Sequence, residues 1–109
     1  MSLSWQTVCH IDALPERSAQ TYPFQGVSYF VIKFDNHIYA YLNACPHRQI
    51  ELEWQENDFF DLDKDYLQCA THGALFLPQT GECISGPCQQ QSLKKVATRV
   101  KAEKIQINI

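Results

Sequence analysis

The chain has 109 residues, of which 45% are hydrophobic and 19% are charged. This length suits one domain with one modest core, and the composition excludes a disordered chain. The net charge of −3 argues against a general nucleic-acid binder, and no apolar run is long enough to span a membrane. The first residues show no basic segment followed by an apolar one, so we expect no secretory signal and a cytoplasmic location.

Strand patterns dominate the chain from its start. Expected strands lie at residues 3–9, 27–34, 37–42, 65–70 and 74–77, with a further hairpin within 96–109. Asp35-Asn36 predicts a tight hairpin turn, and the segment 78–81 predicts a turn between strands. Weak helix signals occur within residues 48–60, in a segment that is long for a loop. Many short strands predict an all-β fold, either a sandwich or a small barrel.

Five cysteines occur, at Cys9, Cys45, Cys69, Cys83 and Cys88. An odd number in a reducing compartment argues against a disulfide framework and favours metal binding or catalysis. Cys83 and Cys88 fit two interpretations, as small buried hydrophobic residues or as a redox-active pair, and the sequence does not decide between them.

Two cysteine–histidine pairs provide the strongest chemical signal. Cys45 and His47 form a C-x-H pair, and Cys69 and His72 form a C-x-x-H pair after twenty-one intervening residues. Four such side chains are enough to close one metal site. We see no partner for His10 or His37 and expect both to lie outside that site.

Three chemistries use these residue types. A structural zinc site takes two cysteines and two histidines, although familiar zinc patterns group the cysteines together and the histidines together. A nucleophilic Cys–His pair needs only one of the two pairs, and no Asn or Asp is obviously placed to orient a base. A [2Fe–2S] centre in which two histidines replace two cysteines on one iron needs one of each from two loops, and the pattern meets that requirement.

The sequence resembles the Rieske ferredoxin family, whose motif is C-x-H followed, after a variable spacer, by C-x-x-H. The passage HGALFLPQTGECISGP, residues 72–87, is similar to the family's H-G, aromatic strand, T-G turn and final G-P. The similarity covers roughly residues 27–109. It implies a single Rieske domain over residues 1–109, with a two-loop cluster-binding sub-domain at about 43–88.

The resemblance also implies one [2Fe–2S] cluster per chain. Cys45 and Cys69 would bind the inner iron, and His47 and His72 the outer iron. The segment 85–87 would cover the cluster. The implied function is one-electron transfer from a flavin-dependent reductase to an oxygenase or similar terminal enzyme, without catalysis by this chain. Alternatives are a small subunit of a nitrite-reductase-like complex, a zinc module that binds a partner, and a redox sensor.

The chain departs from the high-potential members of the family. Those members carry an extra cysteine in each cluster loop, and a serine and a tyrosine whose hydroxyls donate to sulfur. The corresponding positions here are Ala74 and Phe76, and neither loop has a spare cysteine. Fewer donors stabilise the reduced state less, which predicts a potential near the low end of about −150 to +300 mV.

Charge is unevenly distributed along the chain. Residues 51–65 hold seven acids against Lys64, and residues 92–109 hold five basic residues against Glu103. Two interpretations stay open, namely two solvated faces or an electrostatic docking surface for a partner.

Overall fold

The computed structural model describes residues 4–44, 52, 59–61, 63–69, 73–86 and 91–109. One turn of 3-10 helix, η1, spans Ile11–Ala13. The strands are β1 (Trp5–His10), β2 (Ser18–Phe24), β3 (Val27–Phe34), β4 (His37–Leu42), β5 (Leu67–Gln68), β6 (Leu75–Phe76), β7 (Cys83–Ser85), β8 (Lys95–Val96), β9 (Thr98–Lys101) and β10 (Lys104–Asn108). The all-β prediction is confirmed. Nowhere in the described residues is there a helix of the length and hydrophobicity needed to cross a membrane.

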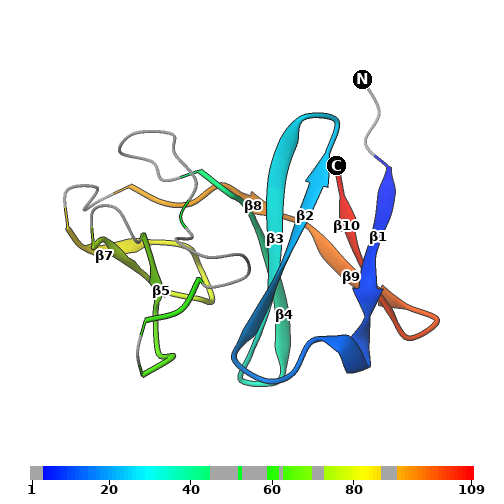
Figure 1. Ribbon diagram of the computed structural model, residues 1–109, viewed down its shortest axis with the longest axis horizontal. Helices are drawn as coiled ribbons and strands as arrows, with labels where there is room; N and C mark the ends of the chain where they lie inside the picture. The colour runs from blue at the N-terminus through cyan, green and yellow to red at the C-terminus, as the bar shows by residue number, and fades with distance from the viewer. Residues whose placement is uncertain (1–3, 45–51, 53–58, 62, 70–72, 87–90) are drawn as a thin grey trace.

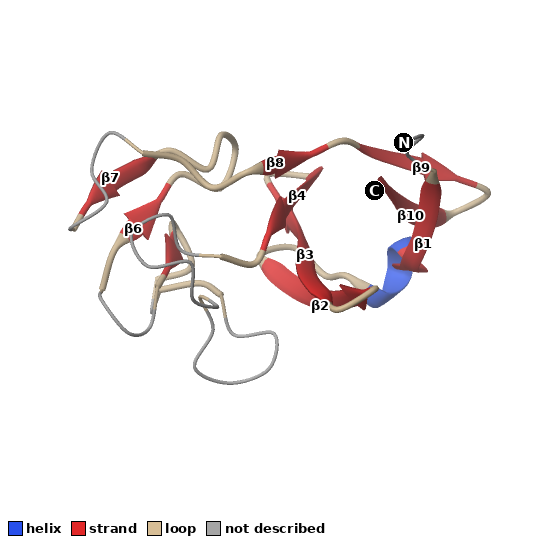
Figure 2. Cartoon of the chain, turned by 90° about the horizontal axis from the view of Figure 1, so that it is seen from above, coloured by secondary structure: helices blue, strands red, loops and turns tan. Residues whose placement is uncertain are grey.

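The strands form three antiparallel sheets. Their orders are β1-β10-β9, β2-β3-β4-β8 and β5-β6-β7. The four-stranded sheet lies in the middle, with the β1-β10-β9 sheet on one side and the small β5-β6-β7 sheet on the other (Figures 1 and 2). The four-stranded sheet therefore separates the small sheet from β1 and β10, the first and last strands.

Strand β3 is buried on both of its faces. Phe30, Val31 and Ile32 are all 0% exposed, and successive side chains of a strand point to opposite faces. Val31 belongs to the core beneath β10, together with Ile105 and Ile107. Phe30 and Ile32 belong to a second core that extends to the small sheet. This double burial explains why residues 27–34 are apolar almost throughout.

Two-residue turns connect three hairpins. The predicted turn at Asp35 and Asn36 has φ angles of 52° and 65°, the geometry of a type I′ turn. Ala102 and Glu103 adopt φ angles of 51° and 64° between β9 and β10, which confirms the predicted terminal hairpin. Gln25-Gly26 joins β2 to β3 in the same way, with φ angles of 52° and 80°.

Several strands differ from the sequence prediction. Strand β2 was not expected, because SAQTYPF has little alternation and contains a proline. It forms because all seven of its residues pair with β3, at a sheet edge where Pro23 is tolerated. The short strands β7 and β8 were also missed. The weak helix at 48–60 falls mostly outside the described residues, and the described ones among them are not helical.

Candidate metal centre

The second ligand loop leaves β5 at Cys69 and returns at β6. The Cys69 N–H donates to the Ala74 carbonyl oxygen at 2.9 Å, and the Gly73 N–H donates to the Cys69 carbonyl oxygen at 2.8 Å. Gly73 has a φ of +70°, which glycine adopts without strain. These bonds close a tight loop at the end of the β5–β6 hairpin. The predicted ligand His72 lies outside the described residues.

Cys69 is the predicted ligand that the structure describes. Its side chain is 0% exposed and belongs to the same core as Phe59, Leu67 and Phe76. A thiolate in this place would be shielded from water, as an inner ligand of a metal cluster has to be. The burial of Cys69 therefore fits its predicted role as a ligand.

The first ligand loop carries Cys45 and His47, which also lie outside the described residues. Its two flanks are described. Asn43, which is only 4% exposed, accepts a hydrogen bond from the Leu52 N–H on its side-chain Oδ1 at 2.9 Å. The Asn43 N–H donates to the Ser28 carbonyl oxygen at 2.9 Å. Sequence reasoning missed Asn43, and the signal available was a polar residue between a strand and a C-x-H pair.

A third segment packs against the second loop. Gly86 has a φ of +105°, and a Cβ built on it would lie 2.8 Å from the Ala74 Cα. Such an approach is open only to glycine. The end of β7 therefore lies directly beside the loop that begins at Cys69. Pro87, the last residue of the predicted covering segment, lies outside the described residues.

Within the part of the chain that the structure describes, no group of three or more His, Cys, Asp or Glu side chains could hold a metal ion. This result is expected, because three of the four predicted ligands are not in that part. The ligand set Cys45, His47, Cys69 and His72 therefore stays a prediction.

The chain matches the family model of the Rieske [2Fe–2S] domain over residues 4–102. It belongs to this family. Its cofactor is accordingly a [2Fe–2S] cluster. A search of curated proteins finds no match.

Solved structures share the Rieske fold with this chain. It is similar to a chain in a complex of reduced oxygenase and oxidized ferredoxin of carbazole 1,9a-dioxygenase (23% identity, TM-score 0.79, 95% of this chain and 92% of that chain). The ferredoxin of carbazole 1,9a-dioxygenase from Nocardioides aromaticivorans IC177 matches at 20% identity and a TM-score of 0.77, over 95% and 96% of the two chains. The quaternary ammonium Rieske monooxygenase CntA matches at 22% identity and a TM-score of 0.82, over 96% of this chain and 31% of that one.

The remaining histidines lie at the end of β1 and at the start of β4. His10 has partners that the sequence did not show, because its Nδ1 accepts the Asp12 N–H at 3.1 Å and its Nε2 lies 3.4 Å from a Glu103 carboxylate oxygen. His37 is exposed at the start of β4, with its Nδ1 2.9 Å from the Asp35 carbonyl oxygen. The exclusion of both histidines from the site stays a prediction.

Among the other cysteines, Cys83 is 3% exposed and its thiol donates to the Ser85 carbonyl oxygen at 3.3 Å. Cys88 lies outside the described residues, so a redox pair with Cys83 stays a prediction. Cys9 is half-buried on β1, in the sheet far from the small sheet, and burial raises the pKa of its thiol.

The end of the acidic segment is joined by an ion pair to the residue that precedes β2 of the central sheet. An Arg17 Nη1 donates to the Asp65 carboxylate at 2.6 Å and to the Lys64 carbonyl oxygen at 3.1 Å. The guanidinium also lies 4.6 Å from the centre of the Phe34 ring. The Asp65 side chain is 55% exposed, so this ion pair lies at the solvated surface, and both interpretations of the acidic segment stay predictions.

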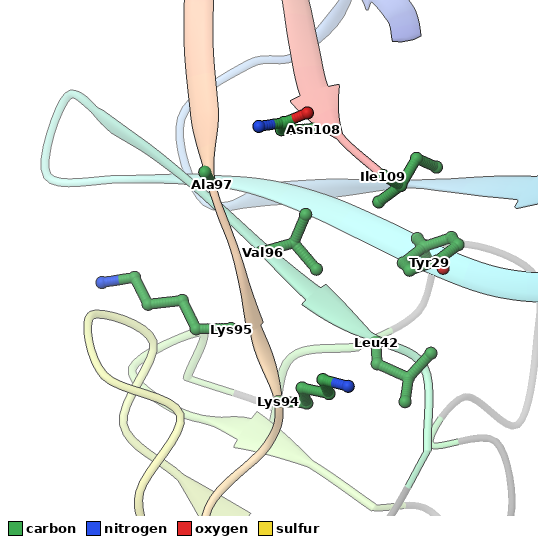
Figure 3. A pocket seen from close by; sticks show the side chains of 8 residues that line it. All are labelled: Tyr29, Leu42, Lys94, Lys95, Val96, Ala97, Asn108 and Ile109. Atoms are coloured by element: carbon green, nitrogen blue, oxygen red, sulfur yellow. The ribbon is translucent and has the colours of Figure 1, made fainter. Parts of the chain in front are cut away.

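A cavity of about 290 Å³ opens beside the start of the first ligand loop. Leu42, Val96, Tyr29 and Ile109 bring apolar side chains together in it, with Lys94 at its margin (Figure 3). The Lys95 ammonium donates to the Gln79 carbonyl oxygen at 3.3 Å and lies over the Tyr39 ring. Cys69, the predicted ligand that the structure describes, is not among the residues that line this cavity.

Proposed function

We propose that the chain is a one-electron carrier whose [2Fe–2S] cluster is bound by Cys45 and Cys69 at one iron and by His47 and His72 at the other. A cluster with two neutral imidazoles takes up and releases one electron at a higher potential than an all-cysteine cluster. The Rieske family match over residues 4–102 carries this proposal. The buried Cys69 and the closed loop around it support the ligand assignment.

The chain's own residues would supply the setting of the cluster. Cys69 would hold the inner iron in a water-excluded core, and the close packing of Gly86 on Ala74 would bring a third segment beside the second ligand loop. We assign the cluster-binding sub-domain to residues of about 43–88. Each histidine would bind iron through one ring nitrogen and keep the other free. This free nitrogen can couple the uptake of a proton to reduction.

The proposed partners are a flavin-dependent reductase as donor and a terminal oxygenase as acceptor. Support comes from the similarity to the ferredoxin of carbazole 1,9a-dioxygenase, which this chain matches along nearly the whole length of both chains. The match to the monooxygenase covers only 31% of that larger chain, which leaves the carrier role as the closer parallel. A cytoplasmic location belongs to the same proposal.

The deciding experiment is electron paramagnetic resonance of the dithionite-reduced protein, with iron and sulfide analysis of the same sample. We expect a rhombic signal with the low average g of histidine-ligated clusters, and equal amounts of iron and sulfide. The variant Cys69→Ser should lose the signal. The matched control Cys9→Ser, which changes a cysteine in the distant sheet, should keep it.

A protein that contains zinc instead of iron and gives no signal would contradict the carrier function. In that case the two Cys–His pairs would form a structural zinc site.

A further inference from the structure

Asn43 is the one buried polar or charged residue among those the structure describes, and its N–H, Nδ2 and Oδ1 each bond to another segment. Its Nδ2 donates to the Ser28 Oγ at 3.2 Å, and its N–H donates to the Ser28 carbonyl oxygen at 2.9 Å. Its Oδ1 accepts the Leu52 N–H at 2.9 Å. One side chain therefore joins the start of β3, the end of β4 and residue 52.

The bond to Leu52 closes the segment that carries Cys45 and His47. Asn43 precedes this segment and Leu52 follows it, so the Asn43–Leu52 hydrogen bond brings its two ends together. A short closed loop has fewer conformations than an open one, and the ends set which of them are accessible.

Leu52 also connects the first loop to the second. It is 0% exposed and belongs to the same core as Phe59, Cys69 and Ala74. Asn43 thus joins the two ends of the first loop through its bond to Leu52. Leu52 in turn belongs to the core that contains Cys69 of the second loop.

We propose that Asn43 is a positioning residue for the cluster, which sets the placement of the Cys45–His47 loop relative to the Cys69–His72 loop. This inference rests on the proposed function, since it concerns the ligands of the same cluster. A cluster that bridges two loops needs both loops at a fixed separation, so an error in their placement changes the iron–ligand geometry and the ease of cluster loss. Asn43 would act through the loops and would not touch the irons as a ligand.

The chemistry of the side chain makes the proposal specific. The Leu52 N–H is buried and the Ser28 hydroxyl is half-buried, and one amide supplies an acceptor to the first and a donor to the second. An aspartate keeps the acceptor for the Leu52 N–H, and the Ser28 hydroxyl can turn to donate to it. A leucine of similar size supplies neither and leaves the Leu52 N–H without an acceptor.

The test compares Asn43→Leu, Asn43→Ser and Asn43→Asp with Ser28→Ala and with Asn108→Leu, all as purified holoprotein. Asn108→Leu is the matched control, because it makes the same change on β10, in a sheet that contains none of the four predicted ligands. The measurements are the rate of iron loss to a chelator, the electron paramagnetic resonance g values, the midpoint potential and the urea midpoint.

We expect Asn43→Leu and Asn43→Ser to lose iron about fivefold faster than the wild type or more, with shifted g values and potential. Asn43→Asp keeps the acceptor and should lose iron more slowly than Asn43→Leu, while its buried charge should lower the midpoint potential and the urea midpoint. Ser28→Ala should change iron loss less than Asn43→Leu. Asn108→Leu should affect only the urea midpoint. If Asn43→Leu does not fold, the iron loss, g values and potential of Asn43→Ser test the inference instead.

Two failures are distinguishable. If Asn43→Leu or Asn43→Ser lowers the urea midpoint but leaves iron loss, g values and potential as in the wild type, Asn43 only stabilises the fold and the inference is wrong. If the wild type itself contains no [2Fe–2S] cluster, the proposed function fails first.

Discussion

Gly86 and Ala74 approach each other so closely that no side chain fits between them. A Cβ on Gly86 would lie 2.8 Å from the Ala74 Cα and 3.1 Å from the Ala74 Cβ. The nearest atom belongs to the backbone, which cannot move aside as cheaply as the tip of a flexible side chain. The contact therefore fixes the end of β7 against the second ligand loop. Two residues after Ala74, Phe76 of β6 is buried in the core.

We expect Gly86→Ala to lower the free energy of unfolding by about 2–4 kcal/mol, since it adds a backbone clash to the cost of a left-handed conformation. Gly26→Ala is the matched control, because Gly26 has a φ of +80° but nothing within 4 Å of a built Cβ. The control should cost about 1–2 kcal/mol. Urea unfolding gives both values, and iron content shows whether Gly86→Ala also weakens the cluster. Equal costs for the two variants would mean that the contact with Ala74 is unimportant.

Ala74 and Phe76 predict a low potential for the proposed cluster. Both side chains are 0% exposed and neither carries a hydroxyl. We expect Ala74→Ser and Phe76→Tyr to raise the midpoint potential by roughly 20–60 mV each, because a hydroxyl that donates to cluster sulfur favours the reduced state. Protein-film voltammetry measures the shift. Ala97→Ser, at an exposed position, should leave the potential unchanged. An unchanged or lower potential in both test variants would refute this explanation.

Tyr41 anchors the turn between β6 and β7. Its buried hydroxyl donates to the Pro78 carbonyl oxygen at 2.6 Å, and its ring lies against Gly81. Tyr41→Phe keeps the ring but leaves the Pro78 carbonyl without this donor, so we expect a loss of about 1–3 kcal/mol in the free energy of unfolding at neutral pH. Tyr66→Phe, at a half-buried position, provides the comparison. A negligible loss in Tyr41→Phe would show that water replaces the hydroxyl.

The same tyrosine makes stability depend on alkaline pH. Burial, and to a smaller extent the nearby Tyr39, raises the pKa of Tyr41 above its ordinary value. The unfolded chain therefore ionises first, near pH 10. The contribution of Tyr41 to stability is complete below that pH and is lost as the pH rises from there toward the folded pKa. Urea midpoints from about pH 8 to 11.5 should fall more steeply for the wild type than for Tyr41→Phe, and parallel curves would contradict the assignment.

Arg17 and Asp65 join the central sheet to the segment that leads into β5. Because this ion pair is largely exposed, we expect a coupling energy of about 0.2–1 kcal/mol that decreases with salt. A double-mutant cycle with Arg17→Leu and Asp65→Asn measures it. Arg17→Lys should recover little of the coupling, since lysine lacks the planar fork and stacks poorly on Phe34. If Arg17→Lys recovers the full coupling energy, the contact depends only on the attraction between opposite charges.

The local parts of this fold could be read from the chain. Strand β3 was predictable because its residues are β-branched or aromatic, and the turn at Asp35-Asn36 because these residue types tolerate positive φ. The terminal hairpin followed from its alternation. The family was also predictable, because the order and spacing of the Cys–His pairs are specific to histidine-ligated clusters, and the match over residues 4–102 confirms it.

Contacts between distant segments required the tertiary structure. Strand β2 forms only because β3 offers it an edge, and its own sequence has too weak a pattern to specify a strand. Arg17 meets Asp65 forty-eight residues along the chain, and Ala74 meets Gly86 across a hairpin.

Residue types and spacing alone determined that this is an all-β protein of the Rieske family with two candidate ligand loops. Only the tertiary structure decided which contacts flank those loops, namely the hydrogen bond between Asn43 and Leu52 and the packing of Gly86 on Ala74. The physical reason is that hydrophobic periodicity and turn chemistry act between neighbours in the chain, whereas the partner of a buried amide or the space beside a glycine is set by segments that meet only after folding.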